Sequence, residues 1–322
     1  MSEPSTEPRL KYFPVSFFAM VMGLTGLAIA WHKAQTVFSL PVDLGTPILV
    51  LAAGLFAILL ALYLTKLVRY RASVKAELEH PIHLNFVPTI SISLILLAIG
   101  MLPYSPGISG VLWVLGTSLH LLLTLYVMGV WLHHEHFEIH HMNPAWFIPV
   151  VGNVLVPIAG VPLGFGELSW FFFSAGMVFW LVLFTIIFYR VLFHHPMAER
   201  MMPTFFILIA PPAVGFIAYL RLTGELDAFA RILFYSGLFL TLLLATQAGR
   251  FLRIPFYLSW WAYSFPLAAI TIATLAMYER TGLTVFAALA WLLLTLVTLM
   301  VVYLLTRTAR AIAGQRICVP AS

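Results

Sequence analysis

Histidine is the residue type in this chain with the clearest potential for chemistry, because most of its copies are clustered. Of the 11 histidines, five lie between residues 133 and 141, in the order His-His-Glu-His-Phe-Glu-Ile-His-His. His80 and His83 precede or open one apolar stretch, and His194 and His195 follow another. Neutral imidazole binds transition metals, and histidine also titrates near neutral pH. The cluster is therefore a candidate metal or proton site.

The spacing His136-x-x-x-His140-His141 fits one histidine box of the membrane-bound di-iron desaturases and hydroxylases. Di-iron chemistry needs several such boxes, and the remaining histidine pairs do not complete another. Three interpretations stay open for the cluster: an iron enzyme, an incidental metal or pH-sensing site, and a polar loop, which we favour. We therefore predict no enzyme activity and no cofactor. The iron content of the purified protein separates the three interpretations.

The stretches that must position these residues are apolar enough to span a membrane. Apolar residues make up 62% of the chain and charged residues 9%, whereas soluble domains have about 45–50% and about 25%. Ten stretches approach the roughly 20 residues that cross a bilayer. They lie near 14–31, 44–67, 82–102, 108–132, 145–163, 168–189, 202–220, 232–248, 254–277 and 283–305. The composition predicts an all-α integral membrane protein, with residues 13–305 as membrane domain and tails at 1–12 and 306–322.

The basic residues predict the orientation of these stretches. With the N-terminus inside, only Lys33, Arg221, Arg231 and Arg280 of the 17 lysines and arginines fall outside. Basic residues concentrate on the cytoplasmic side of membrane proteins. Both tails are therefore predicted to be cytoplasmic, and the net charge of +5 indicates membrane orientation and not nucleic-acid binding.

Proline alternates along these stretches. Every odd stretch carries proline, usually beside an aromatic residue, and the even stretches have none except Pro47 near the start of 44–67. The recurrent prolines are Pro14, Pro88, Pro149, Pro211, Pro212 and Pro266. Proline bends or breaks a helix, and a bilayer tolerates this only where protein or a water-filled cavity satisfies the freed carbonyl. The alternation predicts bent odd helices around a central pore and straight even helices outside them.

Ionisable residues are absent from the middle of the odd stretches. All 12 acidic residues fall at the ends of stretches or in loops. Ion-coupled carriers usually keep an ionisable group at mid-membrane, at a cost of about 2.5–3.5 kcal/mol, and cation channels use carboxylate rings. A neutral wall with basic residues at its cytoplasmic mouth favours anions. We expect His120, in the middle of an even stretch, to form a hydrogen bond between helices.

Several motifs occur in order between residues 12 and 305. They are FPVSFFAMVMGLTGLAIAW at 13–31, HPIHLNFVPTISISL at 80–94, AGM at 175–177 with Trp180, GELD at 224–227 and WAYSFP at 261–266. These motifs resemble the tellurite-resistance/C4-dicarboxylate transporter family, which includes bacterial TehA proteins and the slow anion channels of plant guard cells. The resemblance implies a homotrimer in which each subunit has its own pore, built from five quasi-symmetric helical hairpins.

The resemblance also implies a gate. In the family a phenylalanine on the ninth helix closes the pore, and the matching residue in this sequence is Phe265, beside Pro266. An aromatic ring in a narrow neutral pore excludes water, and a hydrated anion does not pass a dewetted constriction. Further candidates for the pore lining are Phe18, Phe86, Phe147 and Ser264.

We therefore expect a gated channel that passes small inorganic or organic anions across the bacterial inner membrane. Its expected partners are the lipid bilayer and its own copies. Within the same family, the alternatives are a proton-coupled dicarboxylate carrier and an exporter of sulfite or tellurite. An iron enzyme using the histidine cluster is the alternative from another class. The sequence leaves the identity of the anion open.

Overall fold

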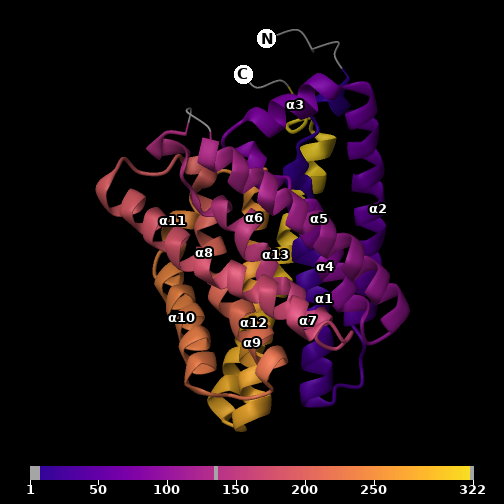
Figure 1. Cartoon of the computed structure of the whole chain (residues 1–322), viewed down its shortest axis with the longest axis vertical. Helices are drawn as coiled ribbons and strands as arrows, with labels where there is room; N and C mark the ends of the chain where they lie inside the picture. Colours follow the sequence, from indigo (N-terminus) through magenta and orange to yellow (C-terminus); the bar gives the residue numbers. More distant parts are fainter. Residues whose placement is uncertain (1–7, 134–136, 320–322) are drawn as a thin grey trace.

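The computed structural model describes residues 8–133 and 137–319, and within them every regular element is a helix (Figure 1). A helix satisfies its backbone hydrogen bonds within one segment, so an apolar helix can cross a membrane. Nine of the described helices are long and apolar enough to do so, and one shorter apolar segment, Pro144–Gly160, corresponds to the fifth predicted stretch. The predicted all-α integral membrane fold is confirmed, and the count of ten spans stays a prediction.

Five long, continuous helices form the outer layer of the bundle. They are α2 (Gly45–Arg69), α5 (Pro106–His133), α8 (Gly166–Phe193), α10 (Ala228–Ala245) and α13 (Thr284–Ala313). In the most apolar 18-residue window of each of these helices, only 28–39% of the window is buried. Their exposed faces carry large apolar side chains such as Val50, Leu122, Leu192 and Phe239. These faces suit a lipid environment, which the sequence pattern also predicts.

Five segments form the inner layer, and each starts as a 3-10 helix before it continues as an α-helix. In the four longer ones, 61–78% of the most apolar 18 residues is buried. The segments are η2–α1 (Val15–Phe17, Phe18–Phe38), η3–α4 (His83–Phe86, Thr89–Met101), η5–α6–η6–α7 (Pro144–Trp146, Phe147–Val151, Gly152–Leu155, Val156–Gly160), η7–α9 (Glu199–Ile209, Ala210–Thr223) and η8–α12 (Leu258–Tyr263, Ser264–Thr281).

The recurrent prolines other than Pro14, which precedes the 3-10 helix η2, mark where the α-helical parts begin. Pro88 directly precedes α4, Pro211 and Pro212 lie in the first turn of α9, and Pro266 is the third residue of α12. Proline has no N–H and a fixed φ, so it fits the first turn of a helix, where the N–H groups have no partner within the helix. The prolines therefore divide the inner segments into 3-10 and α parts, which is the broken helix that an interior proline favours.

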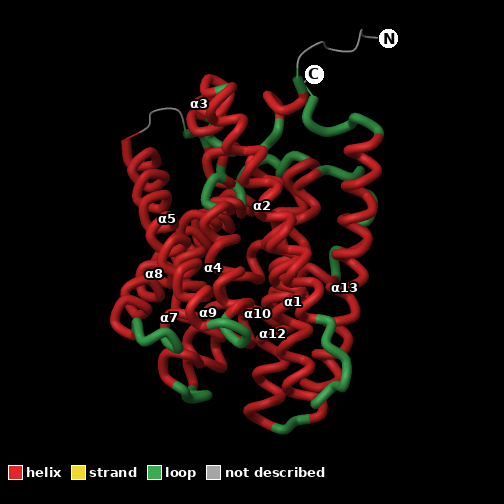
Figure 2. The backbone as a smooth tube through the Cα atoms, turned by 90° about the vertical axis from the view of Figure 1, so that its right-hand side faces the viewer, coloured by secondary structure: helices red, strands yellow, loops and turns green. Residues whose placement is uncertain are grey.

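The inner segments close into a ring. α1 packs against α4, α4 against α7, α7 against α9, α9 against α12, and α12 against α1. Each inner segment also packs against the outer helix that follows it in the sequence, and the helices run side by side along the long axis (Figure 2). These contacts support the five predicted hairpins. A cavity shared by all five inner segments must lie at the centre of this ring.

Tryptophan N–H groups join the inner layer to the outer layer. Trp113 Nε1 of α5 donates to the backbone oxygen of Val156 in α7 at 2.9 Å. Trp261 Nε1 of η8 donates to Thr308 Oγ1 of α13 at 2.9 Å. Each bond satisfies a polar group that would otherwise be costly to bury in an apolar bundle. The bonds fix the depth of the inner segments relative to their outer neighbours.

Short elements gather at one end of the bundle, which we call the α3 end after the helix α3 (Arg71–Glu79) (Figure 1). Arg9 of η1 (Arg9–Tyr12) lies at this end and donates to the backbone oxygen of Ile317 at 3.0 Å. The other short elements of the described chain are η4 (Ile139–His141) and α11 (Ala248–Phe251). α13 continues to Ala313, so the predicted tail at 306–322 begins as helix and not as an extended segment.

Candidate functional site

A cavity of about 310 Å³ lies among the five inner segments. Ligand pockets in proteins range from about 300 to 1,000 Å³, so the space suits a small solute. Every inner segment contributes to its wall. Representative lining residues are Val15 of η2, Ile92 of α4, Gly152 of η6, Val214 of α9 and Phe265 of α12.

The cavity is bordered at the α3 end by ionisable side chains, which we call the mouth: Glu77, His80, His83 and Arg200. They belong to α3, to the loop after it, or to the first residues of η3 and η7. The lining residues farther along the inner helices, which we call the inner wall, are apolar: Met22, Ile92, Leu155, Val214 and Phe265. The structure thus places charge at the mouth and an apolar surface beyond it.

Phe265 lies where the inner wall meets the neighbouring helix α1. A methyl group added at Gly26 of α1 would come within 3.2 Å of Phe265 Cδ2 and 3.0 Å of Ala268 Cβ. The Phe265 ring therefore occupies space that the absent side chain of Gly26 leaves free. Phe265 borders the cavity on one side and packs on α1 on the other.

The structure brings some of the predicted pore residues together and separates others. Phe86, Phe147, Pro14, Pro211 and Pro266 line the cavity with Phe265. Pro88, Pro149, Pro212, Phe18 and Ser264 are not among its lining residues.

Phe18 and Ser264 have other partners. Phe18 is fully buried, and its ring lies edge-on to Phe56 and Tyr63 of the outer helix α2, with centroids 5.8 and 6.2 Å away. The Ser264 hydroxyl donates to the Trp261 backbone oxygen at 2.7 Å. Both side chains serve helix packing and not the cavity wall, because the faces of α1 and α12 that carry them point toward other helices.

Glu77 is a mouth residue that the sequence did not single out. Its carboxylate lies 3.0 Å from Lys66 Nζ of α2, and it accepts from the Tyr63 hydroxyl at 3.1 Å and from the Val15 N–H at 3.3 Å. Lys66 is 2% exposed and also donates to the Phe13 backbone oxygen at 2.8 Å. The pair fixes the start of the first inner segment. A lysine near the end of a predicted apolar stretch was the signal available in the sequence.

The surroundings of His80 at the mouth disfavour its protonated form. Its ring stacks on His83 at 4.0 Å, and its Nδ1 accepts from the N–H groups of Ile82 and His83 at 3.1 and 3.3 Å. Burial, followed by the charge of Arg200, lowers the pKa of His80 from its ordinary value of 6.5. At neutral pH the mouth therefore carries the positive charge of Arg200, with Glu77 neutralised by Lys66.

The proposed histidine box is only partly described. His136 lies outside the described residues. His140 pairs with the Glu138 carboxylate at 3.1 Å, and His141 accepts from the Glu138 N–H at 3.1 Å. Among the residues that the structure describes, no three His, Cys, Asp or Glu side chains converge as metal ligands would. The described part of the loop thus forms a local polar network.

His120 makes the expected bond between helices. Its Nδ1 lies 2.9 Å from Ser91 Oγ of α4, and the side chain is fully buried. The prediction of an interhelical hydrogen bond is confirmed.

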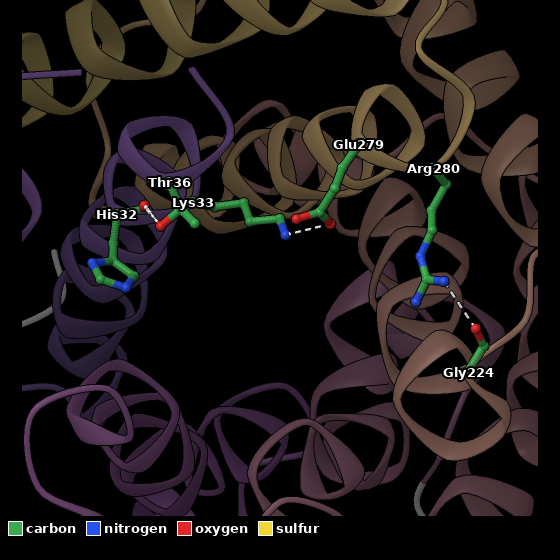
Figure 3. A network of polar contacts seen from close by, with 6 residues as sticks. All are labelled: His32, Lys33, Thr36, Gly224, Glu279 and Arg280. Carbon is green, nitrogen blue, oxygen red and sulfur yellow. Dashed lines mark hydrogen bonds and ion pairs between the residues drawn. The ribbon is translucent and has the colours of Figure 1, made fainter. Parts of the chain in front are cut away.

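Charged groups at the opposite end of the ring are also paired (Figure 3). Lys33 Nζ of α1 lies 2.6 Å from Glu279 Oε2 of α12, and Arg280 donates to the Gly224 backbone oxygen at 3.0 Å. These contacts join the ends of inner segments to one another. The charged residues of these inner helices thus lie near the ends of the ring.

A family model described as a voltage-dependent anion channel, SLAC1, matches residues 12–309. The chain belongs to the SLAC1 family. The match includes all five inner segments, the five outer helices except the last residues of α13, and therefore the whole cavity wall.

Relatives within the SLAC1 family occur in plants and bacteria. The S-type anion channel SLAH3 of Arabidopsis thaliana is 30% identical over 94% of this chain and 48% of its own. The guard cell S-type anion channel SLAC1 of the same plant is 27% identical over 94% and 56%. A tellurite resistance protein TehA homolog of Haemophilus influenzae is 28% identical over 91% of each chain. The chain spans about half the length of these plant relatives, and the predicted family is confirmed.

Proposed function

We propose that this SLAC1-family protein is a channel for small anions, in which the cavity is part of the conduction path and the Phe265 ring closes it. The observation that carries the proposal is the position of Phe265. Its ring borders the cavity shared by all five inner segments and packs on the next helix of the ring at Gly26.

The apolar inner wall supports this mode of closure. A narrow apolar constriction loses its water, and ions do not enter a dewetted pore. A phenyl ring covers about 150–250 Å², so a change of rotamer or a small shift of α12 is enough to open the path. No covalent chemistry is required of the site.

The charges at the mouth favour anions. Arg200 contributes a positive charge at the cavity, whereas the Glu77 carboxylate is compensated by Lys66 at 3.0 Å. In the described inner segments, acidic and basic residues lie only near the ends, as Lys33 and Glu279 do. Without a carboxylate along the inner wall, no fixed negative charge attracts a cation into the apolar section.

The same proposal includes the assembly and the membrane. The exposed apolar faces of the outer helices are covered by lipid and by two further copies in a homotrimer, with one pore in each subunit. We place the protein in the bacterial inner membrane. Its α3 end faces the cytoplasm in this proposal, because most of the basic residues lie at this end and basic residues concentrate on the cytoplasmic side of membrane proteins.

The test is the Phe265→Ala variant, studied as purified protein in planar bilayers. We expect its chloride current to exceed that of the wild type by about tenfold or more, because each 1.4 kcal/mol removed from a barrier is a factor of ten. Phe239→Ala is the matched control, because this ring is 65% exposed on the outer helix α10. Unchanged current in a folded Phe265→Ala protein would contradict the gate assignment.

The same bilayers separate a channel from a carrier. With chloride, nitrate and malate exchanged in turn, a channel gives reversal potentials that follow each anion gradient. Electrical silence together with proton-dependent uptake of malate into vesicles would instead identify a proton-coupled carrier.

A further inference from the structure

Arg190 is a buried arginine in the last turn of the outer helix α8. In the part of the chain that the structure describes, two lysine or arginine residues are buried, Lys66 at 2% exposure and Arg190 at 4%. Such residues are almost never buried unless they are paired. Lys66 follows this rule, because it pairs with the Glu77 carboxylate at 3.0 Å. Arg190 does not follow it.

The Arg190 guanidinium has no partner among the described residues. Its Nε is completely enclosed and forms no hydrogen bond, whereas the two terminal nitrogens are not completely enclosed. The guanidinium is therefore recessed in the bundle with its terminal nitrogens at the surface. A buried charge without a partner is strongly destabilising, so the position of Arg190 requires an explanation.

This surface lies at the α3 end of the bundle. The loop after α8 leads to η7, whose Arg200 belongs to the mouth, so the C-terminal end of α8 is at the α3 end. The side chains of Tyr189, Leu192 and Phe193 are 52%, 68% and 71% exposed. Arg190 is thus a recessed cation beside an apolar surface, at the end of a helix that is long and apolar enough to span a membrane.

A second polar atom without a partner lies one turn further along the chain. His194 Nε2 is enclosed and forms no hydrogen bond within residues 8–133 and 137–319. The His194 N–H donates to the Arg190 backbone oxygen at 3.1 Å, so the helical spacing continues to His194. Residues four apart lie on the same side of a helix. One side of the α8 terminus therefore carries two side chains whose polar atoms the described chain does not satisfy.

We propose that Arg190 binds the phosphate group of an anionic phospholipid at the surface of the bilayer. A planar guanidinium matches phosphate with two parallel N–H···O bonds. Leu192 and Phe193 then contact the acyl chains, which a soluble phosphate lacks. His194 donates to the same phosphate when its Nε2 carries the proton. The site is separate from the cavity, because Arg190 is not among the cavity's lining residues, and it does not depend on the proposed channel function.

The test measures the melting temperature of the delipidated, detergent-solubilised protein as dioleoyl phosphatidylglycerol is added. Two comparison ligands separate the parts of this lipid: dioleoylglycerol has the same chains without the phosphate, and inorganic phosphate has no chains. Arg190→Gln removes the charge. Arg69→Gln is the matched control, because Arg69 is an exposed arginine at the end of another outer helix, α2.

We expect phosphatidylglycerol to raise the melting temperature of the wild type and of Arg69→Gln, because a ligand that binds only the folded state stabilises it. Arg190→Gln should need about tenfold more lipid or beyond for the same rise, the range of hydrogen bonds to a charged group. Dioleoylglycerol and inorganic phosphate should each raise the melting temperature of the wild type less than the intact lipid does.

A second variant covers the case in which Arg190→Gln does not fold. Arg190→Lys keeps the charge but loses the planar arrangement of donors, so it should bind the lipid more weakly than the wild type. Light scattering of each variant reports whether the oligomer is intact.

Four results would overturn the inference. The same lipid dependence in the wild type and in the folded Arg190 variant would show that Arg190 does not bind the lipid. An equal loss in Arg69→Gln would assign the effect to general charge attraction. A rise with inorganic phosphate as large as that with the lipid would assign the site to a soluble anion. A changed oligomer mass in the Arg190 variant, with lipid binding unchanged, would assign the guanidinium to a contact between copies of the chain.

Discussion

At the scale of single residues, close packing around Phe265 depends on the glycine opposite it. Gly26 gives the ring its place on α1, since a methyl group there would lie 3.2 Å from Phe265 Cδ2. Tightly packed interiors respond to one added methyl group by shifting side chains or backbone. The position of the Phe265 ring therefore depends on α1 as much as on α12.

We expect Gly26→Ala to destabilise the protein by about 1–3 kcal/mol, the usual cost of overpacking. We also expect Gly26→Ala to raise the resting anion current, because the added methyl group displaces the Phe265 ring from its packing position on α1. Thermal unfolding and bilayer currents measure the two effects. Gly249→Ala is the control, because a methyl group there meets nothing within 4 Å. Normal stability and normal current in Gly26→Ala would show that the ring is not held by α1.

His80 makes the stability of the mouth depend on pH. Burial and the charge of Arg200 lower the pKa of His80 below 6.5, so the unfolded chain binds a proton at a higher pH than the folded chain does. The stability that the folded protein gains from a neutral His80 is fully present above pH 6.5. It is lost progressively as the pH falls below that value. Arg200 is the neighbouring group whose charge adds to the effect of burial, and the His83 ring stacks on His80 at 4.0 Å.

The expected result is a lower melting temperature at about pH 5.5 than at about pH 7.5. The difference should be smaller in His80→Gln, which cannot take up the proton. Differential scanning fluorimetry of the detergent-solubilised protein at the two pH values checks this. An equal pH effect in the variant and the wild type would assign the pH dependence to other groups.

At the scale of elements, α3 connects an outer helix to the start of the ring. Glu77 of α3 binds Lys66 of α2 and the N–H of Val15, so three elements meet at one carboxylate. Removing one partner of a buried ion pair leaves the other charge uncompensated and costs about 3–5 kcal/mol. The orientation of the mouth therefore depends on the Lys66–Glu77 pair.

We expect Lys66→Met to lower the free energy of unfolding by about 3–5 kcal/mol, and the double variant Lys66→Met/Glu77→Gln to recover much of the loss. Denaturant or thermal unfolding of the four proteins of this cycle measures the coupling. Lys75→Met is the control, because Lys75 and Glu79 are 76% and 63% exposed at 3.5 Å, where ion pairs contribute little. A loss in the double variant equal to the sum of the losses in the two single variants would exclude coupling.

At the scale of the whole molecule, the ring of inner segments gives one chain a complete cavity wall. All five segments that line the cavity come from the same chain, so the cavity wall is complete without a subunit interface. The outer helices present apolar side chains and small residues such as Gly54 and Gly129, which have no heavy atom within 4 Å of an added methyl group. Small residues allow helices of neighbouring copies to approach closely in a membrane.

We therefore expect a homotrimer whose subunits conduct independently. Light scattering of the solubilised protein, corrected for bound detergent, should give three times the chain mass. Bilayer recordings of Phe265→Ala should show three equal conductance levels. A monomeric mass, or a single level that never subdivides, would contradict the proposed assembly.

The sequence alone determined the features that depend on local chemistry. Apolar length identifies the helices, and proline changes its own helix wherever the chain goes, so the inner and outer layers follow from Pro14, Pro88, Pro211 and Pro266. The family motif around Phe265 gave the gate prediction, which the cavity supports and the bilayer experiment must test.

Tertiary structure alone decided the features that depend on contacts between distant residues. It joined Lys66 to Glu77, placed Gly26 under the Phe265 ring, and turned Phe18 toward α2 and away from the cavity. It also set His120 of an outer helix behind Gly152 of an inner one. Neither residue carries a local signal for this contact, because it exists only where the hairpins pack into a closed ring.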